Sequence, residues 1–254
     1  MRTSLSCASL LVLAIVSGCS PKSAAPPPAA ASAGKKVAAA TAGSISGKVS
    51  FTGTPPAVEM IKMSSDPACT PNASPMQPSD AVLVGKAGEV QNAFVYVKDG
   101  LDPAYTFDVP TKALEFYQRG CTYVPRIFGV RAGQPIEIIS DDNTLHNVHA
   151  LPKSNLEFNK SEAFKGARMT QVFTVPEVMV RFKCDVHAWM NAYVGVMAHP
   201  FFAVSAADGT FDLKGLPPGT YTVEAWHERF GTLTQKITVA DKQALTVAFA
   251  FAAK

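Results

Sequence analysis

The sequence has few charged residues and no region where charge of one sign accumulates. Only 17% of its 254 residues are charged, and the net charge is +3. Proteins that follow a phosphate backbone carry a basic patch or stripe, so we expect no nucleic acid among the partners. A hydrophobic share of 47% is enough for one or two buried cores in a chain of this length.

The sequence also lacks the usual patterns of hydrolytic and phosphate-binding enzymes. It has no Ser/His/Asp pattern and no glycine-rich phosphate loop. The adjacent carboxylates Asp141 and Asp142 are typical of a turn. Long amphipathic helices and repeats at a fixed period are absent as well. A hydrolase is therefore not expected.

The first eighteen residues are typical of an export signal. Arg2 supplies a positive charge, and the apolar run Leu10–Val16 is too short to span a membrane as a helix. The run ends in Val16-Ser17-Gly18-Cys19, which resembles the lipobox of bacterial lipoproteins. The resemblance implies that Cys19 is lipidated and anchors the protein on the periplasmic side of the cell envelope, and Ser20 favours the outer membrane. The alternative is cleavage elsewhere, with Cys19 incidental.

Residues 19–44 consist almost entirely of Ala, Pro, Ser, Gly and Lys. A segment of this composition cannot bury a core of its own. It predicts a tether with a mean reach of roughly 25–30 Å. Such a tether would hold the folded part just off a membrane.

From Ile45 onward, apolar and polar residues alternate in short runs separated by turn signals. Asp208-Gly209 is a hairpin turn signal, and only Leu156–Lys165 has a pattern compatible with a helical turn. We therefore predict an all-β chain with strands that include 45–51, 93–98, 127–131, 136–140, 171–175, 178–184, 192–198, 211–213, 221–225, 237–239 and 245–251.

One of these strands ends in a group of potential metal ligands. The alternation of strand 178–184 places Cys184 on its apolar face, so the thiol points toward the core. The loop that follows, Cys184-x-x-His187-x-x-Met190, can wrap a thiolate, an imidazole and a thioether around a single ion. Another strand upstream is followed by His146-Asn147-Val148-His149.

These side chains suit copper. A thiolate and two imidazoles in a near-trigonal plane, with a weak axial thioether, hold copper in electron-transfer sites. Zinc accepts Cys and His, but Met is not among its usual ligands. His146 and His149 compete to supply the second imidazole. Because they are three residues apart, they would lie on opposite faces of a strand.

His146-Asn147-Val148-His149, taken together with Cys184-x-x-His187-x-x-Met190, resembles the cupredoxins. The ligand loop is most similar to that of amicyanin, with plastocyanin a longer-looped relative. The resemblance covers roughly residues 116–200 and implies a Greek-key sandwich over 113–200. It also implies that His146, Cys184, His187 and Met190 hold one type 1 copper ion. Asn147 would be a hydrogen-bonding brace between the ligand loops.

The cysteine count is consistent with a thiolate ligand. Cys7 leaves with the signal and Cys19 takes the lipid, which leaves an odd number of thiols in an oxidising compartment. If Cys184 binds the metal, Cys69 and Cys121 remain to form a disulfide, for which the chain-entropy model gives about 4 kcal/mol. The alternative is that both are buried free thiols.

The C-terminal part resembles a second family. Gly209-Thr210-Phe211 and the run 216–221 are similar to the carboxypeptidase regulatory-like, transthyretin-like (prealbumin) β-sandwich, as are Ile45–Val49 and Asn92–Val97. We therefore predict that 45–112 and 201–254 form one domain, into which the copper domain 113–200 is inserted. The alternative is two consecutive domains, 45–200 and 201–254.

These resemblances imply a membrane-tethered one-electron carrier rather than an enzyme, because four protein ligands leave no open position for a substrate. Electrons would pass through the edge of His187 to a redox partner such as a cytochrome, an oxidase or a dehydrogenase. Ala188, Trp189 and Tyr193 would form an apolar docking patch, with core packing as the alternative for Trp189. Two other functions stay open: copper storage, delivery or protection, and a binding or scaffold module with a structural copper site.

Overall fold

A computed structural model describes residues 34–70 and 76–253. The predicted signal peptide 1–18, the lipidation site Cys19 and most of the predicted tether lie outside the described residues. Within the part described, no helix has the length and apolar character needed to cross a membrane.

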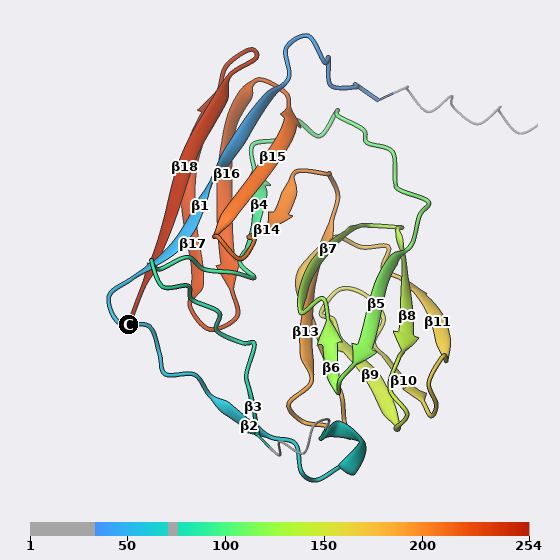
Figure 1. Cartoon of the computed structure of the whole chain (residues 1–254). Helices are drawn as coiled ribbons and strands as arrows, with labels where there is room; N and C mark the ends of the chain where they lie inside the picture. Colours follow the sequence, from blue (N-terminus) through green and yellow to red (C-terminus); the bar gives the residue numbers. More distant parts are fainter. Residues whose placement is uncertain (1–33, 71–75, 254) are drawn as a thin grey trace, which may run out of the picture. The chain divides into compact units, whose positions relative to one another are not determined.

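The described chain is all-β, as predicted, and its larger sheets form two sandwiches (Figure 1). The first combines a sheet of order β10-β9-β12-β13-β7 with a sheet of order β11-β8-β5-β6. Its strands are β5 (Leu114–Arg119), β6 (Thr122–Val124), β7 (Ile127–Arg131), β8 (Pro135–Ser140), β9 (His146–Leu151), β10 (Phe158–Glu162), β11 (Arg168–Val172), β12 (Glu177–Lys183) and β13 (Asn191–Met197).

The second sandwich combines strands from both ends of the described chain. One sheet has the order β15-β1-β18, with β1 parallel to β18, and the other has the order β14-β4-β16-β17. Its strands are β1 (Gly43–Thr52), β4 (Phe94–Asp99), β14 (Phe202–Val204), β15 (Thr210–Leu216), β16 (Gly219–His227), β17 (Gly231–Val239) and β18 (Ala244–Ala252); the short strands β2 (Met60–Lys62) and β3 (Met76–Pro78) pair separately.

Each sandwich has its own apolar core. In the first, Phe182 of β12 is fully buried and meets the rings of Phe116 and Phe128 edge-on, at centroid distances of 5.4 and 6.0 Å. Burial of such rings supplies much of the driving force for folding. Because Phe182 lies two residues before Cys184, the same packing fixes the end of β12 that leads into the thiol.

Three neighbouring strands bring the predicted ligands to one end of the first sandwich. β9 begins at His146, and the hairpin between β12 and β13 carries the loop from Cys184 to Met190. β12 runs antiparallel between the other two, with Phe182 opposite Ala150 of β9 and Ala192 of β13. The end of β12 therefore lies beside the start of β9.

Two segments differ from the sequence-based expectation. Residues 156–165, where a helical turn was expected, contain strand β10, because pairing with β9 outweighs a weak local helical pattern. Lys35, within the predicted tether, donates its N–H to the Ala104 carbonyl at 2.8 Å, and its own carbonyl accepts the Thr106 N–H at 2.9 Å. This end of the tether therefore lies along the second sandwich.

Candidate metal centre

His146, Cys184 and His187 lie together and are all buried. The Nδ1 atoms of the two histidines are 3.0 Å apart, and Nδ1 of His187 is 3.9 Å from Cys184 Sγ. Zinc–nitrogen and zinc–thiolate bonds of about 2.0 and 2.3 Å set the scale of such sites. One ion can therefore reach all three atoms, and a soft thiolate with two imidazoles is a donor set that fits copper.

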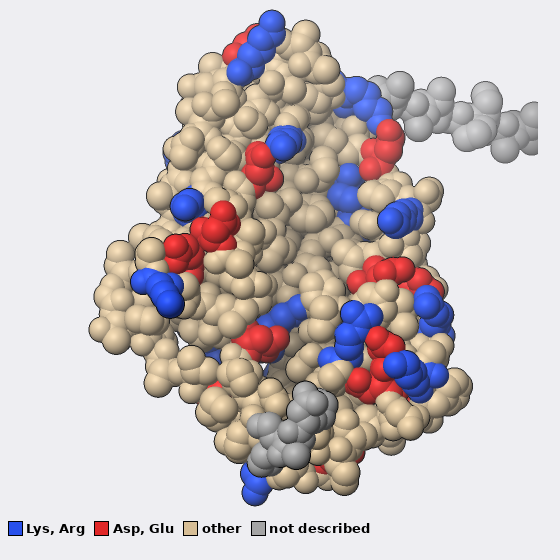
Figure 2. Space-filling view, viewed as in Figure 1, with Lys and Arg blue, Asp and Glu red and all other residues tan. Residues whose placement is uncertain are grey.

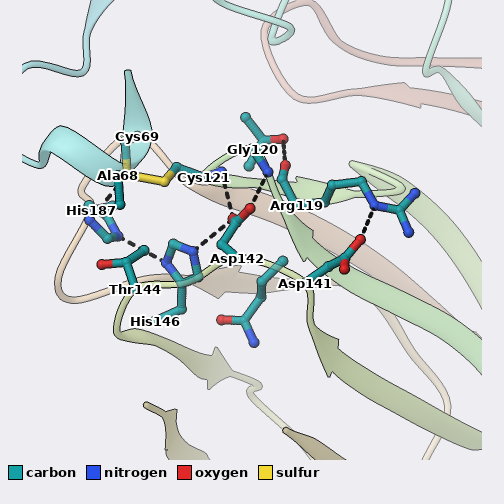
Figure 3. Close-up of polar contacts among 12 residues, drawn as sticks. Ala68, Cys69, Arg119, Gly120, Cys121, Asp141, Asp142, Thr144, His146 and His187 are labelled. Carbon is teal, nitrogen blue, oxygen red and sulfur yellow. Dashed lines mark hydrogen bonds and ion pairs between the residues drawn. A yellow bond between two sulfur atoms is a disulfide. The ribbon is translucent and has the colours of Figure 1, made fainter. Parts of the chain in front are cut away.

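Each imidazole directs Nδ1 toward the other ring and Nε2 toward a carboxylate. Figure 3 shows this for His146, which lies between His187 and Asp142. His146 Nε2 is 2.9 Å from Asp142 Oδ2, and His187 Nε2 is 3.0 Å from Asp66 Oδ2. When Nε2 donates its proton to the carboxylate, both Nδ1 lone pairs face the same point. Two lone pairs 3.0 Å apart repel unless a positive charge lies between them, which a proton or a metal ion can supply.

The surroundings of Cys184 favour the thiolate that a soft metal requires. Burial alone raises the pKa of this thiol. Hydrogen bonds with His146 and with the backbone amides of Asn147, His187 and Val186 oppose burial, and the pKa falls below its ordinary value. The anion is thus stabilised before any metal binds.

The two histidines differ in their readiness to take a proton. Burial lowers the pKa of His146, but hydrogen bonds with Asp142 and Cys184 outweigh it and raise the pKa to about 9. For His187 burial prevails, assisted by the neighbouring His146, and its pKa falls despite the hydrogen bond to Asp66. Near neutral pH the metal-free pair of imidazoles therefore carries one positive charge, on His146.

Asn147 connects the two segments that carry the ligands. Its Oδ1 accepts the Asp185 N–H at 2.7 Å and lies 3.2 Å from Cys184 Sγ. Its Nδ2 donates to Asn159 Oδ1 at 2.7 Å. A single side chain thus links β9, β10 and the loop after β12.

Met190 is buried at the end of the ligand loop. Its N–H donates to the His187 carbonyl at 2.9 Å, and its carbonyl accepts the Cys184 N–H at 3.2 Å. These two bonds close the loop into a compact turn and hold Met190 beside the core. Its role as an axial ligand stays a prediction.

His149 lies outside the cluster. Its Nδ1 is 3.0 Å from Asp185 Oδ2, and its Nε2 is 2.8 Å from Glu157 Oε1. The structure thus brings His146 and not His149 to the thiolate. The other histidines have structural partners: His199 Nε2 donates to the Val97 carbonyl at 2.9 Å, and the ring of His227 stacks on Phe230.

The side chain of His187 is only 2% exposed, because a distant segment covers it. The predicted disulfide between Cys69 and Cys121 is present, and Cys69 Sγ lies 3.5 Å from His187 Nε2. Cys69 belongs to the 3-10 helix η1 (Pro67–Cys69), whose N-cap is Asp66. The edge of His187 is therefore buried, and the passage of electrons through it stays a prediction.

The predicted docking patch is assembled only in part. Ala188 and its neighbour Val186 are exposed, Val186 by 49%. Trp189 is half-buried against the first core and donates its Nε1–H to the Cys121 carbonyl at 2.9 Å. Tyr193 does not join this surface, because its ring packs on Trp226 of β16 with centroids 5.1 Å apart.

Asp66 and Asp142 were not predicted as partners of the ligands. Asp142, four residues before His146, has the sequence signature of a turn residue. Asp66 is separated from His187 by 121 residues, and no local pattern marks it. Only its position three residues before Cys69 could have indicated that it lies near the site, because the disulfide to Cys121 brings this segment there.

Residues 191–252 match the family model of the carboxypeptidase regulatory-like domain. The matched segment includes β14 to β18 of the second sandwich and begins in β13, which pairs with β12 and β7 in the first. The second resemblance drawn from the sequence is thereby confirmed. No curated protein matches the chain in sequence.

Solved structures similar to this chain have the cupredoxin fold. A Cu(I) form of an amicyanin variant covers 42% of this chain and 99% of its own, with 18% identity and a TM-score of 0.31. A purple cupredoxin from Nitrosopumilus maritimus covers 33% and 99%, with 19% identity and a TM-score of 0.29. The Cu-containing nitrite reductase NirK from Thermus scotoductus SA-01 covers 38% of this chain, with 19% identity and a TM-score of 0.32, and the chain spans 27% of that enzyme's length. The likeness concerns the fold and assigns neither metal nor activity.

Proposed function

We propose that this protein is a type 1 copper protein that carries single electrons in the bacterial cell envelope. The observation that carries the proposal is the buried cluster of one thiolate and two imidazole Nδ1 atoms within reach of one ion. Bound copper would supply reversible one-electron transfer, which is the chemistry of this ligand type. His146, Cys184, His187 and Met190 would hold the ion.

The rigidity of the ligands supports a carrier. Cys184 follows a strand paired on both sides, and His146 begins the neighbouring strand. Asn147 ties the two segments together through the Asp185 amide. Ligands held in this way move little when an electron arrives or leaves. The same burial leaves no open side for a substrate, which supports a carrier over an enzyme.

A lipid on Cys19 and the tether that follows would keep the carrier beside a membrane, where a redox partner protein can meet it. The exposed Val186 and Ala188 in the ligand loop support a small apolar docking surface. On the face drawn in Figure 2, Lys and Arg are interspersed with Asp and Glu. That face therefore has no patch of one sign that would select a strongly charged partner.

A copper titration of the whole chain in detergent micelles tests the proposal. We expect one equivalent of Cu(II) to give an intense blue colour and narrow copper hyperfine splitting, and reduction by one electron to be reversible. Cys184→Ser should abolish the colour. His146→Gln should do the same, whereas the matched control His149→Gln should retain it.

Failure to bind copper, or a colour that persists in Cys184→Ser, would contradict the proposal. Rapid transfer of copper to a chelator would favour delivery over electron transfer.

A further inference from the structure

We infer that Asp66 and Asp142 are positioning residues for the metal centre, and that the Cys69–Cys121 disulfide holds both carboxylates against the ligand imidazoles. By accepting the Nε2 proton, each carboxylate would fix the tautomer and direction of one ring, so that both Nδ1 atoms point at the metal. The inference rests on the proposed copper site and assigns roles to residues outside the ligand set.

Asp142 is firmly held behind His146. One carboxylate oxygen, Oδ2, accepts from His146 Nε2 at 2.9 Å and from the Cys121 N–H at 2.8 Å. The other, Oδ1, accepts the Gly120 N–H at 2.7 Å. The two amides fix the orientation of the carboxylate, so that Oδ2 stays directed at the imidazole.

Asp66 occupies the equivalent place behind His187. Its Oδ2 accepts from His187 Nε2 at 3.0 Å and from the Thr144 hydroxyl at 2.6 Å. Its Oδ1 accepts the Ala68 N–H at 2.8 Å, which is the N-cap bond of η1. Thr144 lies two residues before His146, so the loop that leads to one ligand also steadies the carboxylate behind the other.

The disulfide joins the supports of the two carboxylates covalently. Cys69 lies three residues after Asp66, and the Cys121 amide is itself a donor to Asp142. Figure 3 shows this chain of contacts from Cys69 through Cys121 and Asp142 to His146. Trp189, within the ligand loop, adds a bond from its Nε1–H to the Cys121 carbonyl at 2.9 Å. One covalent bridge therefore restrains both imidazoles and the ligand loop from Cys184 to Met190.

Two consequences follow for the metal. Hydrogen bonds from imidazole ligands to carboxylates raise the basicity of the ligands, and loss of such a partner typically weakens metal binding by about 10- to 100-fold. The added negative charge also stabilises Cu(II) more than Cu(I), because the interaction grows with the charge on the ion. The two aspartates should therefore lower the reduction potential of the centre.

The first test compares Asp66→Asn and Asp142→Asn with Asp141→Asn in the whole chain in detergent. Asp141 neighbours Asp142, but its carboxylate pairs with Arg119 at 2.7 Å and Lys165 at 3.2 Å and contacts neither imidazole. We expect both test variants to lose Cu(II) to a chelator about 10- to 100-fold more readily and to have a raised reduction potential. Asp141→Asn should match the unmodified protein. Asp66→Asn is the primary variant, since Asp66 lies nearer the surface than Asp142 and makes fewer backbone bonds.

The second test needs no copper and separates this inference from the proposed function. Nitrogen–proton NMR of the metal-free chain should show an Nε2 proton on both His146 and His187 that exchanges slowly with water. In Asp66→Asn the His187 proton should exchange faster, while Asp141→Asn leaves both unchanged. An Nε2 without a proton, or test variants equal to the control in exchange and in potential, would overturn the inference. A chain that binds no copper yet shows both protected protons would contradict only the proposed function.

Discussion

Removal of the Cys69–Cys121 bridge is expected to destabilise the first sandwich by about 4 kcal/mol. The bridge joins residues separated by 52 positions, and the chain-entropy model assigns about 4 kcal/mol to a loop of that length. Both cysteines are fully buried in the first core. The double substitution Cys69→Ala/Cys121→Ala therefore also removes two buried sulfur atoms, whose packing must be accounted for separately.

Urea unfolding followed by tryptophan fluorescence can measure the loss for the first sandwich alone. The sequence has two tryptophans. Trp189 packs on the first core, and Trp226 belongs to the second sandwich. A Trp226→Phe background therefore makes Trp189 the sole reporter. In that background we expect the midpoint of unfolding to fall in the double alanine variant. It should fall similarly in the unsubstituted protein after reduction by a dithiol, which keeps every sulfur atom in place.

Cys184→Ala is the matched control, because it removes a buried sulfur from the same core without breaking a bridge. Cys184→Ala should lower the free energy of unfolding clearly less than the double variant does. If oxidised and reduced protein unfold with free energies within about 1 kcal/mol of each other, the chain-entropy reasoning fails for this bridge. The disulfide would then have to be explained by its position alone.

Two further predictions concern the cores. Phe182→Ala removes a fully buried ring and should lower the free energy of unfolding by about 3–5 kcal/mol, whereas Leu156→Ser, at a side chain 91% exposed, should change it by less than about 0.5 kcal/mol. Urea unfolding checks both, and equal effects would contradict the packing described. His227 has a pKa lowered from 6.5 to about 4, by burial first and then by Arg126 and Arg229. Between these pH values the unfolded chain binds a proton that the folded chain does not. The free energy of unfolding therefore decreases as the pH is lowered from 6.5 to about 4, by up to about 3 kcal/mol. His227→Gln should lack this share of the pH dependence, and an unchanged slope would refute the assignment.

The parts of the site that the sequence made predictable are local. Alternation along β12 placed the Cys184 thiol inside, and the loop up to Met190 is a single hairpin connection. The period of a strand also predicted that His146 and His149 face opposite sides, which is a property of the backbone. The resemblance to the cupredoxins then selected His146, and the structure directs His149 to Asp185 and Glu157.

The environment of the ligands depends instead on contacts across the fold. The sequence predicts Asp142 to be a turn residue. In the structure its carboxylate accepts hydrogen bonds from the backbone amides of Gly120 and Cys121, which precede β6. The hydrogen bonds of this carboxylate to the amides depend on the pairing of β5 with β6 and β8, which a local turn pattern does not predict. The cover over His187 comes from residues 66–69, outside the stretch that resembles a cupredoxin. A resemblance confined to one stretch carries no information on a segment that folds over it.

For the disulfide, the cysteine count predicted the pairing but not the position of the bridge in the fold. Cysteine parity predicted the pairing of Cys69 with Cys121 and a rough stabilisation, because both depend only on number and separation. It could not predict that the bridge lies 3.5 Å from a ligand imidazole, since that depends on where residues 66–69 return to the first sandwich. A cross-link placed there acts on the folded state as well as on the unfolded one: it limits the conformations of the open chain and restrains the carboxylates behind both imidazoles. Stability and the electronic properties of the centre are therefore expected to change together when the bridge is broken. They should separate when Asp66 alone is replaced, because that change leaves the covalent link intact.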